Sequence, residues 1–172
     1  MSSRLEWLGS LPLEEAEAHL LTCNASRTWA RKMVANRPYA DESSLIAAAV
    51  TGVTELAWED VTEALDAHPR IGERTAAKHQ SEREAQWSAQ EQSGASDADA
   101  RVLQELAAGN LSYEQQFGHV FLIRASGRSA EEMLGQLRHR MSNTANEEQF
   151  VVRRELADIT GLRVRKLLED AL

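Results

Sequence analysis

Apolar and polar residues alternate at helical spacing over most of this sequence. Trp58, Val61 and Leu65 are separated by three and four residues, which places them on one face of an amphipathic helix. The pattern predicts that this helix continues to His68, because the proline that follows disfavours a helical conformation at the residue before it. The C-terminal part has the same spacing from about Ala145 to Leu168. The sequence therefore predicts an all-α fold of about seven to nine helices.

Capping residues predict where these helices begin. Serine, threonine and aspartate side chains accept hydrogen bonds from the free N–H groups of a first helical turn. Such residues precede three of the apolar segments, at Ser10, at Ser26 and at Asp41 or Ser43. Three more pairs have the Ser/Thr-x-x-Glu spacing of a capping box, namely Ser88 with Glu91, Ser129 with Glu132 and Thr144 with Glu147. A further helix is predicted from Asp97 to Gln116.

Two segments do not fit the helical pattern. Residues 71–95 are polar and poor in aliphatic side chains, which predicts a long, ordered loop. Val120-Phe121-Leu122-Ile123 is a short apolar run between Gly118 and Gly127. Periodicity does not decide whether this run is a short strand or a buried extended segment.

Length, charge and cysteine content narrow the classes of protein. The 172 residues suit a single domain over residues 1–172. A net charge of −8 argues against binding to nucleic acid or to an anionic membrane surface. No apolar run approaches the ~20 residues of a membrane span. The single cysteine, Cys23, cannot form an internal disulfide, which favours a reducing, cytoplasmic compartment. Metal-ligand spacings are absent, so a transition-metal site has little support, and the absence of glycine-rich phosphate loops disfavours nucleotide-dependent chemistry.

His68 is the first candidate for chemistry. It is predicted at the C-terminus of a helix, where the partial negative charge of the helix end favours the imidazolium form. Such a group would donate a proton near neutral pH. The alternative is that His68 only caps the last carbonyl groups of its helix.

Ser88 and Glu91 are the second candidates. They can form an ordinary capping box. They can also form a polar binding site, in which a hydroxyl, a carboxylate and the free N–H groups of a helix N-terminus face a ligand. The two interpretations are compatible, because a cap can fix the geometry of a binding turn.

The apolar face of the C-terminal helix contains an arginine. Steps of four, three, four and four residues place five side chains on that face: Val152, Leu156, Ile159, Arg163 and Leu167. An arginine is uncommon at a buried position unless it is paired, because its charge cannot be removed. The partner would be a carboxylate such as Glu91 or a bound anionic substrate. Alternatively, the stem of Arg163 lies along the core and its head reaches water.

Seven motifs are spread over most of the chain: Trp29 with Arg37-Pro38-Tyr39, His68-Pro69-Arg70-Ile71-Gly72, Ser88-Ala89-Gln90-Glu91-Gln92, Asn110-Leu111-Ser112-Tyr113, Phe117-Gly118-His119-Val120-Phe121, Ala125-Ser126-Gly127-Arg128-Ser129 and Ile159-Thr160-Gly161-Leu162-Arg163-Val164. Together they resemble the motifs of the 2-oxo-4-hydroxy-4-carboxy-5-ureidoimidazoline (OHCU) decarboxylases of urate degradation. Their order, and the pairing of His-Pro with Ser-x-x-Glu-Gln, make the resemblance specific.

This resemblance implies an all-α, cofactor-free and typically homodimeric enzyme that converts OHCU, a small ureide, to (S)-allantoin. It implies that His68 is the acid/base histidine, that Glu91 acts with it and with Ser88 on the substrate, and that Arg163 binds an anionic group. Other residues are expected to line the site, the last of them mainly through backbone groups: Pro69, Ala89, Gln90, Gln92, Phe121, Ile123, Arg124, Ala125, Ser126 and Gly127.

The chain departs from the family pattern at three places. Many members have Asp-Leu after His-Pro, where this chain has Arg70-Ile71, and the segment Glu73–Trp87 is longer than expected. His119 stands where an aromatic or apolar residue is more usual. Two other functions also fit the residues. One is a lyase or hydrolase that acts on another small ureide. The other is a helical module that binds a partner protein, in which His68, Glu91 and Arg163 would lie apart and each be satisfied locally.

Overall fold

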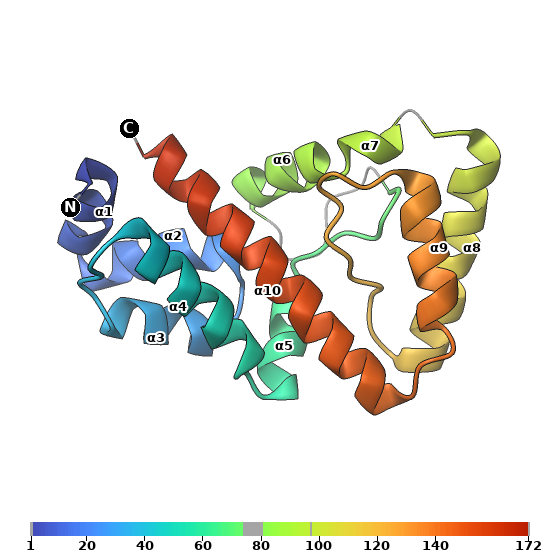
Figure 1. The fold of residues 1–172 in the computed structure, drawn as a ribbon, viewed down its shortest axis with the longest axis horizontal. Helices are drawn as coiled ribbons and strands as arrows, with labels where there is room; N and C mark the ends of the chain where they lie inside the picture. The colour runs from blue at the N-terminus through green and yellow to red at the C-terminus, as the bar shows by residue number, and fades with distance from the viewer. Residues whose placement is uncertain (1, 74–80, 97, 172) are drawn as a thin grey trace. The chain divides into compact units, whose positions relative to one another are not determined.

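Residues 2–73, 81–96 and 98–171 are described by the computed structural model, and they form ten helices and no strand. The prediction of an all-α fold is confirmed, and the number of helices is close to the predicted range. The helices, drawn in Figure 1, are α1 (Ser3–Ser10), α2 (Leu13–Cys23), α3 (Arg27–Ala35), α4 (Glu42–Thr54), α5 (Trp58–Leu65), α6 (Glu82–Glu91), α7 (Ser93–Ser96), α8 (Ala100–Phe117), α9 (Ala130–Arg140) and α10 (Ala145–Asp170).

Contacts between residues divide the chain into two units. Unit 1 contains the described residues up to Ala64 and those from Leu156 onward, and unit 2 contains those from Leu65 to Glu155. The prediction of one domain over residues 1–172 stays a prediction. Within the described ranges, every helix is too short or too polar to cross a membrane.

Unit 1 is organised around α3, which packs against α2 and α4. Trp29 on α3 is 1% exposed, and its indole N–H donates to the carbonyl oxygen of Ala49 at 3.0 Å. A Cβ atom at Gly52 would lie 3.1 Å from the Trp29 ring, so a residue without a side chain suits this close approach of α4. The Asn24 side chain donates to the Thr160 hydroxyl at 3.2 Å and thereby links the end of α2 to α10.

Two of the three helix starts predicted for unit 1 are confirmed. The side chains of Ser26 and Asp41 cap α3 and α4 as predicted. The prediction at Ser10 is wrong, because Ser10 is the last residue of α1, a helix that Ser2 caps. The next helix begins after Pro12, where the missing N–H of proline costs no helical hydrogen bond.

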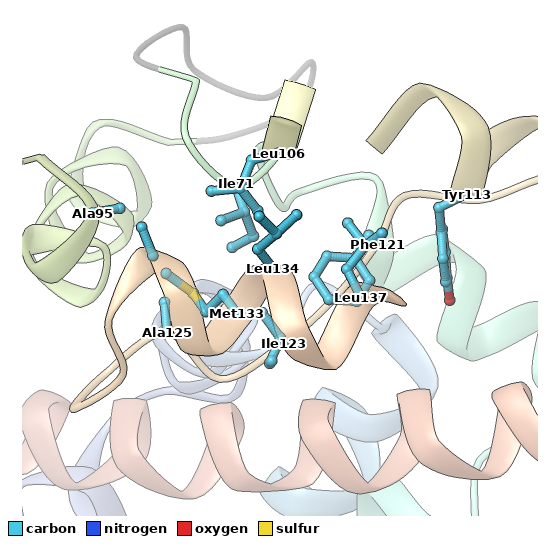
Figure 2. Packing of buried hydrophobic residues seen from close by; sticks show 11 residues of the cluster. Ile71, Ala95, Leu106, Tyr113, Phe121, Ile123, Ala125, Met133, Leu134 and Leu137 are labelled. Atoms are coloured by element: carbon cyan, nitrogen blue, oxygen red, sulfur yellow. The ribbon is translucent and has the colours of Figure 1, made fainter. Parts of the chain in front are cut away.

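Unit 2 has its own hydrophobic cluster, shown in Figure 2. Its helices α8 and α9 pack along each other. The apolar run that follows α8 is a buried extended segment, and its alternate residues Phe121, Ile123 and Ala125 are at most 6% exposed. Figure 2 shows these side chains beside Met133 and Leu137 of α9. The segment therefore contributes its side chains to the core without strand pairing, since the described residues contain no strand.

Helix α6 contradicts the predicted loop over residues 71–95. It begins with a complete capping box, in which the Ser81 hydroxyl accepts from the N–H of Glu84 at 3.2 Å and the Glu84 carboxylate accepts from the N–H of Ser81 at 3.4 Å. The predicted loop and the longer Glu73–Trp87 segment include residues 74–80, which lie outside the described residues.

The predicted capping box at Ser88 and Glu91 is wrong for the same reason. Both residues lie in the last turn of α6, so neither is at a helix N-terminus. The pair Ser81–Glu84 has the same spacing seven residues earlier and precedes the helix.

The remaining predicted starts in unit 2 agree with the structure. Ser129 caps α9, and Thr144 forms a complete capping box with Glu147 at the start of α10. Asp99 caps α8, whereas the predicted first residue, Asp97, lies outside the described residues.

Candidate active site

His68 lies beyond α5 rather than within it. The helix ends at Leu65, and the Leu65 carbonyl oxygen accepts from the N–H of His68 at 3.0 Å. The prediction that the helix continues to His68 is therefore wrong, because the chain leaves the helix through a turn at residues 66–67. His68 is 9% exposed and is followed by half-buried Pro69, whose ring restricts the backbone. The imidazole is thus held in a buried turn next to a rigid residue.

Arg70 ties the chain after His68 to α8. Its guanidinium donates to both carboxylate oxygens of Glu114, from Nε at 2.7 Å and from Nη2 at 2.9 Å, and from Nη1 to Glu73 at 3.2 Å. These hydrogen bonds raise the pKa of the Arg70 guanidinium, and the bonds to Glu114 contribute more than the bond to Glu73. The residue at which this sequence departs from the family pattern therefore anchors the turn that carries His68.

Two amides hold the same turn through its backbone. The Asn110 side chain, 2% exposed, donates to the carbonyl oxygen of Ile71 at 3.0 Å. The Gln92 side-chain oxygen accepts from the N–H of Gly72 at 3.0 Å. Gln92 was predicted to line the substrate site, and its Oε1 here links the end of α6 to the His68 turn.

Ser88 and Glu91 lie one turn apart on α6, so they share a face of that helix. Ser88 is buried and Glu91 is half-buried, whereas Ala89 and Gln90 are exposed. Because Ser88 and Glu91 are at the C-terminal end of α6, no helix begins at Ser88, and the predicted site on the N-terminus of such a helix is wrong.

The segment Phe121–Gly127 was predicted to line the site through its backbone. Its residues 121, 123 and 125 are buried in the hydrophobic cluster, Arg124 and Ser126 are half-buried, and Gly127 is exposed. It ends in a turn, in which the carbonyl oxygen of Ala125 accepts from the N–H of Arg128 at 3.1 Å. Gly127 has a φ of +77° at the third position of that turn, which explains a glycine there.

A buried ionic network that the sequence analysis missed adjoins this segment. Arg140, 2% exposed, donates from Nε to both oxygens of Glu148, at 2.8 and 3.2 Å. Glu148 is 0% exposed and also accepts from the Tyr113 hydroxyl at 2.7 Å. Burial and the hydrogen bond to Glu148 raise the pKa of Tyr113.

A sequence signal for this network exists. The face that contains Val152 and Leu156 extends back by four residues to Glu148, and the buried positions Met133 and Leu137 of α9 extend forward by three to Arg140. Helical spacing therefore places Glu148 and Arg140 on buried faces in the same way as it places Arg163.

Arg163 is 1% exposed, and it lies in unit 1 whereas the other predicted site residues lie in unit 2. The other four residues predicted on its face, Val152, Leu156, Ile159 and Leu167, are also buried. The alternative in which the Arg163 head reaches water is therefore wrong. A guanidinium this deeply buried requires hydrogen-bonding or anionic partners.

In the described part of the chain, metal-ligating side chains and cavities give no further candidate among the predicted site residues. Within the described ranges no three His, Cys, Asp or Glu side chains are grouped so that they could hold a metal ion. A cavity of about 280 Å³ in unit 1 is lined by residues that include Leu5, Leu8, Arg37 and Tyr39, none of them a predicted site residue. The Arg37 guanidinium donates to backbone carbonyl groups, among them that of Leu8 at 2.9 Å, so it has a structural use there.

The comparisons with known proteins identify the class. Residues 9–165 match the sequence model of a family described as OHCU decarboxylase. The chain belongs to the OHCU decarboxylase family.

A curated relative and two solved structures agree with that assignment. The uric acid degradation bifunctional protein TTL of Arabidopsis thaliana is 34% identical over 161 residues, which cover 93% of this chain and 49% of the relative, so the chain spans about half of that protein's length. A crystal structure of an OHCU decarboxylase in the presence of (S)-allantoin matches with a TM-score of 0.72 and 32% identity, covering 87% of this chain and 96% of the other. A crystal structure of (S)-allantoin synthase, 19% identical with a TM-score of 0.67 over 95% of this chain and 53% of the other, shows the same fold.

Proposed function

We propose that this protein is a carboxy-lyase that converts OHCU to (S)-allantoin without a cofactor. The observation that carries the proposal is the match to the OHCU decarboxylase family over residues 9–165, together with a 32% identical OHCU decarboxylase structure determined in the presence of (S)-allantoin. The small-molecule substrate would be a ureide, and the net charge of −8 argues against nucleic acid and anionic membranes as partners.

The chemistry of the substrate explains why such a reaction needs no metal or organic cofactor. OHCU has a carboxylate on a ring carbon that also bears a hydroxyl, next to a ring C=N bond. When the bond to the carboxylate breaks and CO₂ leaves, its electron pair moves into the conjugated ring. The protein then has to orient the carboxylate across the ring plane, stabilise the developing charge, and deliver a proton to one face of the ring.

We assign roles to three of the predicted residues. His68 delivers the proton, since imidazole titrates near neutral pH and this one is held in a buried turn. Glu91 accepts hydrogen bonds from the substrate hydroxyl or its ureido N–H groups, with Ser88 beside it on α6. Arg163 holds a carbonyl or carboxylate group with its planar fork of donors. The site lining is proposed as the resemblance implies it: Pro69, Ala89, Gln90, Gln92, Phe121, Ile123, Arg124, Ala125, Ser126 and Gly127.

Arg163→Lys is expected to lower kcat/KM for OHCU by roughly ten- to a hundredfold, because an ammonium cannot reproduce two parallel hydrogen bonds from one planar group. Initial rates at several OHCU concentrations measure the effect. Arg165→Lys is a suitable control, since Arg165 is an exposed residue on the same helix. Unchanged kinetics in Arg163→Lys would show that the guanidinium does not hold the substrate.

The proposed activity is tested by following the circular dichroism of allantoin formed from OHCU that is generated in place from urate. Handedness has to be measured, because OHCU also decays spontaneously to racemic allantoin. A rapid rise of one-handed allantoin with the protein supports the proposal. A racemic product at the background rate would reject it, and other small ureides and then protein partners would become the candidates.

We also propose that the protein acts as a homodimer in the cytoplasm. The homodimer is supported by the family resemblance and the compartment by the single, buried cysteine, which suits a reducing environment. Sedimentation equilibrium is expected to give twice the chain mass of 19.1 kDa. A mass of one chain at micromolar concentration would contradict the dimer.

A further inference from the structure

Arg140 contacts the start of the segment Phe121–Gly127 in two ways. Its Nη1 donates to the carbonyl oxygen of Leu122 at 2.8 Å, and its guanidinium carbon lies 4.6 Å from the centre of the Phe121 ring. The same guanidinium donates from Nε to the carboxylate of Glu148 on α10, and its carbon lies 5.9 Å from the centre of the Tyr113 ring. One side chain therefore fixes both a backbone oxygen and a ring of this segment.

A second ion pair, between Glu155 and Arg128, holds the other end of the segment. Glu155 on α10 accepts from the guanidinium of Arg128 at 3.0 Å and from the backbone N–H of Arg124 at 3.4 Å. The side chains of this pair are 22% and 12% exposed. Glu148 and Glu155 are seven residues apart and therefore lie on one face of α10. All the residues of the two ion pairs, Arg140–Glu148 and Arg128–Glu155, belong to unit 2.

The energetics of the Arg140–Glu148 ion pair point to a positioning role. A buried ion pair gains little stability over a well-packed apolar pair, because the desolvation of both charges offsets their attraction. An apolar pair, however, can neither donate to the Leu122 carbonyl nor hold the plane of a guanidinium against Phe121. What the ion pair adds over apolar packing is a defined position for a backbone that lacks strand partners among the described residues.

We infer that Arg140 is a positioning residue for the decarboxylation, and that it acts by holding the Phe121–Gly127 backbone in the conformation that binds the substrate. Glu148 fixes the orientation of Arg140, and the Tyr113 hydroxyl fixes Glu148. This inference rests on the proposed function, in which the backbone of the segment lines the site.

Arg140→Lys tests the inference, because lysine keeps the charge beside Glu148 but cannot bond Glu148 and Leu122 while lying flat against Phe121. We expect KM for OHCU to rise about tenfold or more while kcat changes less, as for the loss of ground-state binding. We also expect amide hydrogen exchange of residues 121–127 to accelerate selectively, relative to the α8 and α9 amides.

Two further variants separate positioning from general stability. Leu106→Ala removes a fully buried side chain from the same cluster but removes no hydrogen bond of either ion pair. It should therefore destabilise unit 2 but leave KM and the exchange of residues 121–127 near those of the wild type. Tyr113→Phe removes only the hydroxyl that donates to Glu148 and should shift KM and exchange in the direction of Arg140→Lys, by less. It carries the test if Arg140→Lys does not fold.

The outcomes distinguish this inference from the proposed function. Wild-type protein that forms no one-handed allantoin rejects the proposed function, and with it the assignment of Arg140 to that reaction. Wild-type activity with an unchanged KM and unchanged exchange in the Arg140→Lys or Tyr113→Phe protein overturns the inference alone. Equal KM shifts in Arg140→Lys and Leu106→Ala, measured where both are folded, overturn it as well, since the effect would then be one of stability.

Discussion

Replacing His68 with asparagine is expected to lower the turnover of OHCU by roughly 10²–10⁴-fold while substrate binding survives. Asparagine is close to histidine in size and can keep a hydrogen bond in the buried turn, but it cannot take up and release a proton near neutral pH. The effect should therefore fall mainly on kcat. It is measured from the formation of one-handed allantoin by circular dichroism, with KM taken from the same series.

His139→Asn provides the matched control for this experiment. His139 is an exposed residue in the last turn of α9, and its replacement makes the same chemical change outside the predicted site. We expect wild-type rates from this variant. Near-normal turnover by His68→Asn would refute the assignment of the proton donor to His68.

The largest expected loss of stability follows from Glu148→Gln. Glutamine has nearly the shape of glutamate, but it leaves the Arg140 guanidinium, which is 2% exposed, without a compensating charge. Removing one partner of a buried ion pair typically costs about 3–5 kcal/mol. We expect a decrease of this size in the free energy of unfolding, measured by urea denaturation, with one transition monitored by both fluorescence and circular dichroism.

Glu105→Gln is the control for this prediction. Like Glu148, Glu105 forms ion pairs with arginine, here with Arg101 at 3.4 Å and with Arg138 at 3.1 Å. These pairs are on the surface, where the two arginine side chains are 83% and 62% exposed. Exposed pairs of this kind contribute about 0–1 kcal/mol. If Glu148→Gln cost no more than Glu105→Gln, the buried network would not be a determinant of stability.

Local sequence patterns were sufficient for most of the helices. The predicted caps at Ser26, Asp41, Ser129 and Thr144 are confirmed, because a cap depends on contacts within a few residues of itself. The apolar spacing predicts the extent of α10 and places Arg163 on a buried face. That spacing leaves open whether the guanidinium reaches water, and the structure shows that it is buried.

One failure arose where two local patterns were equivalent. Ser81–Glu84 and Ser88–Glu91 have the same capping-box spacing, and only the first lies at a helix start. Once α6 begins at Glu82, its first four N–H groups are those that need a cap, and Ser88 is already inside the helix. Similarly, a short apolar run such as residues 120–123 does not reveal whether strand partners exist, and the choice depended on the packing around it.

The sequence by itself determined the helical class, most helix starts and the residues that carry the family resemblance, since these depend on spacing along the chain. Only the tertiary structure decided that Gln92 and Arg70 hold the His68 turn. It also decided that Arg140, paired with Glu148, holds the backbone of the segment after α8. These contacts join residues 8 to 44 positions apart in the sequence. The Arg140 and Glu148 charges are buried and must find partners in space. The spacing of neighbouring residues along the chain does not show which distant residues will meet in the folded protein.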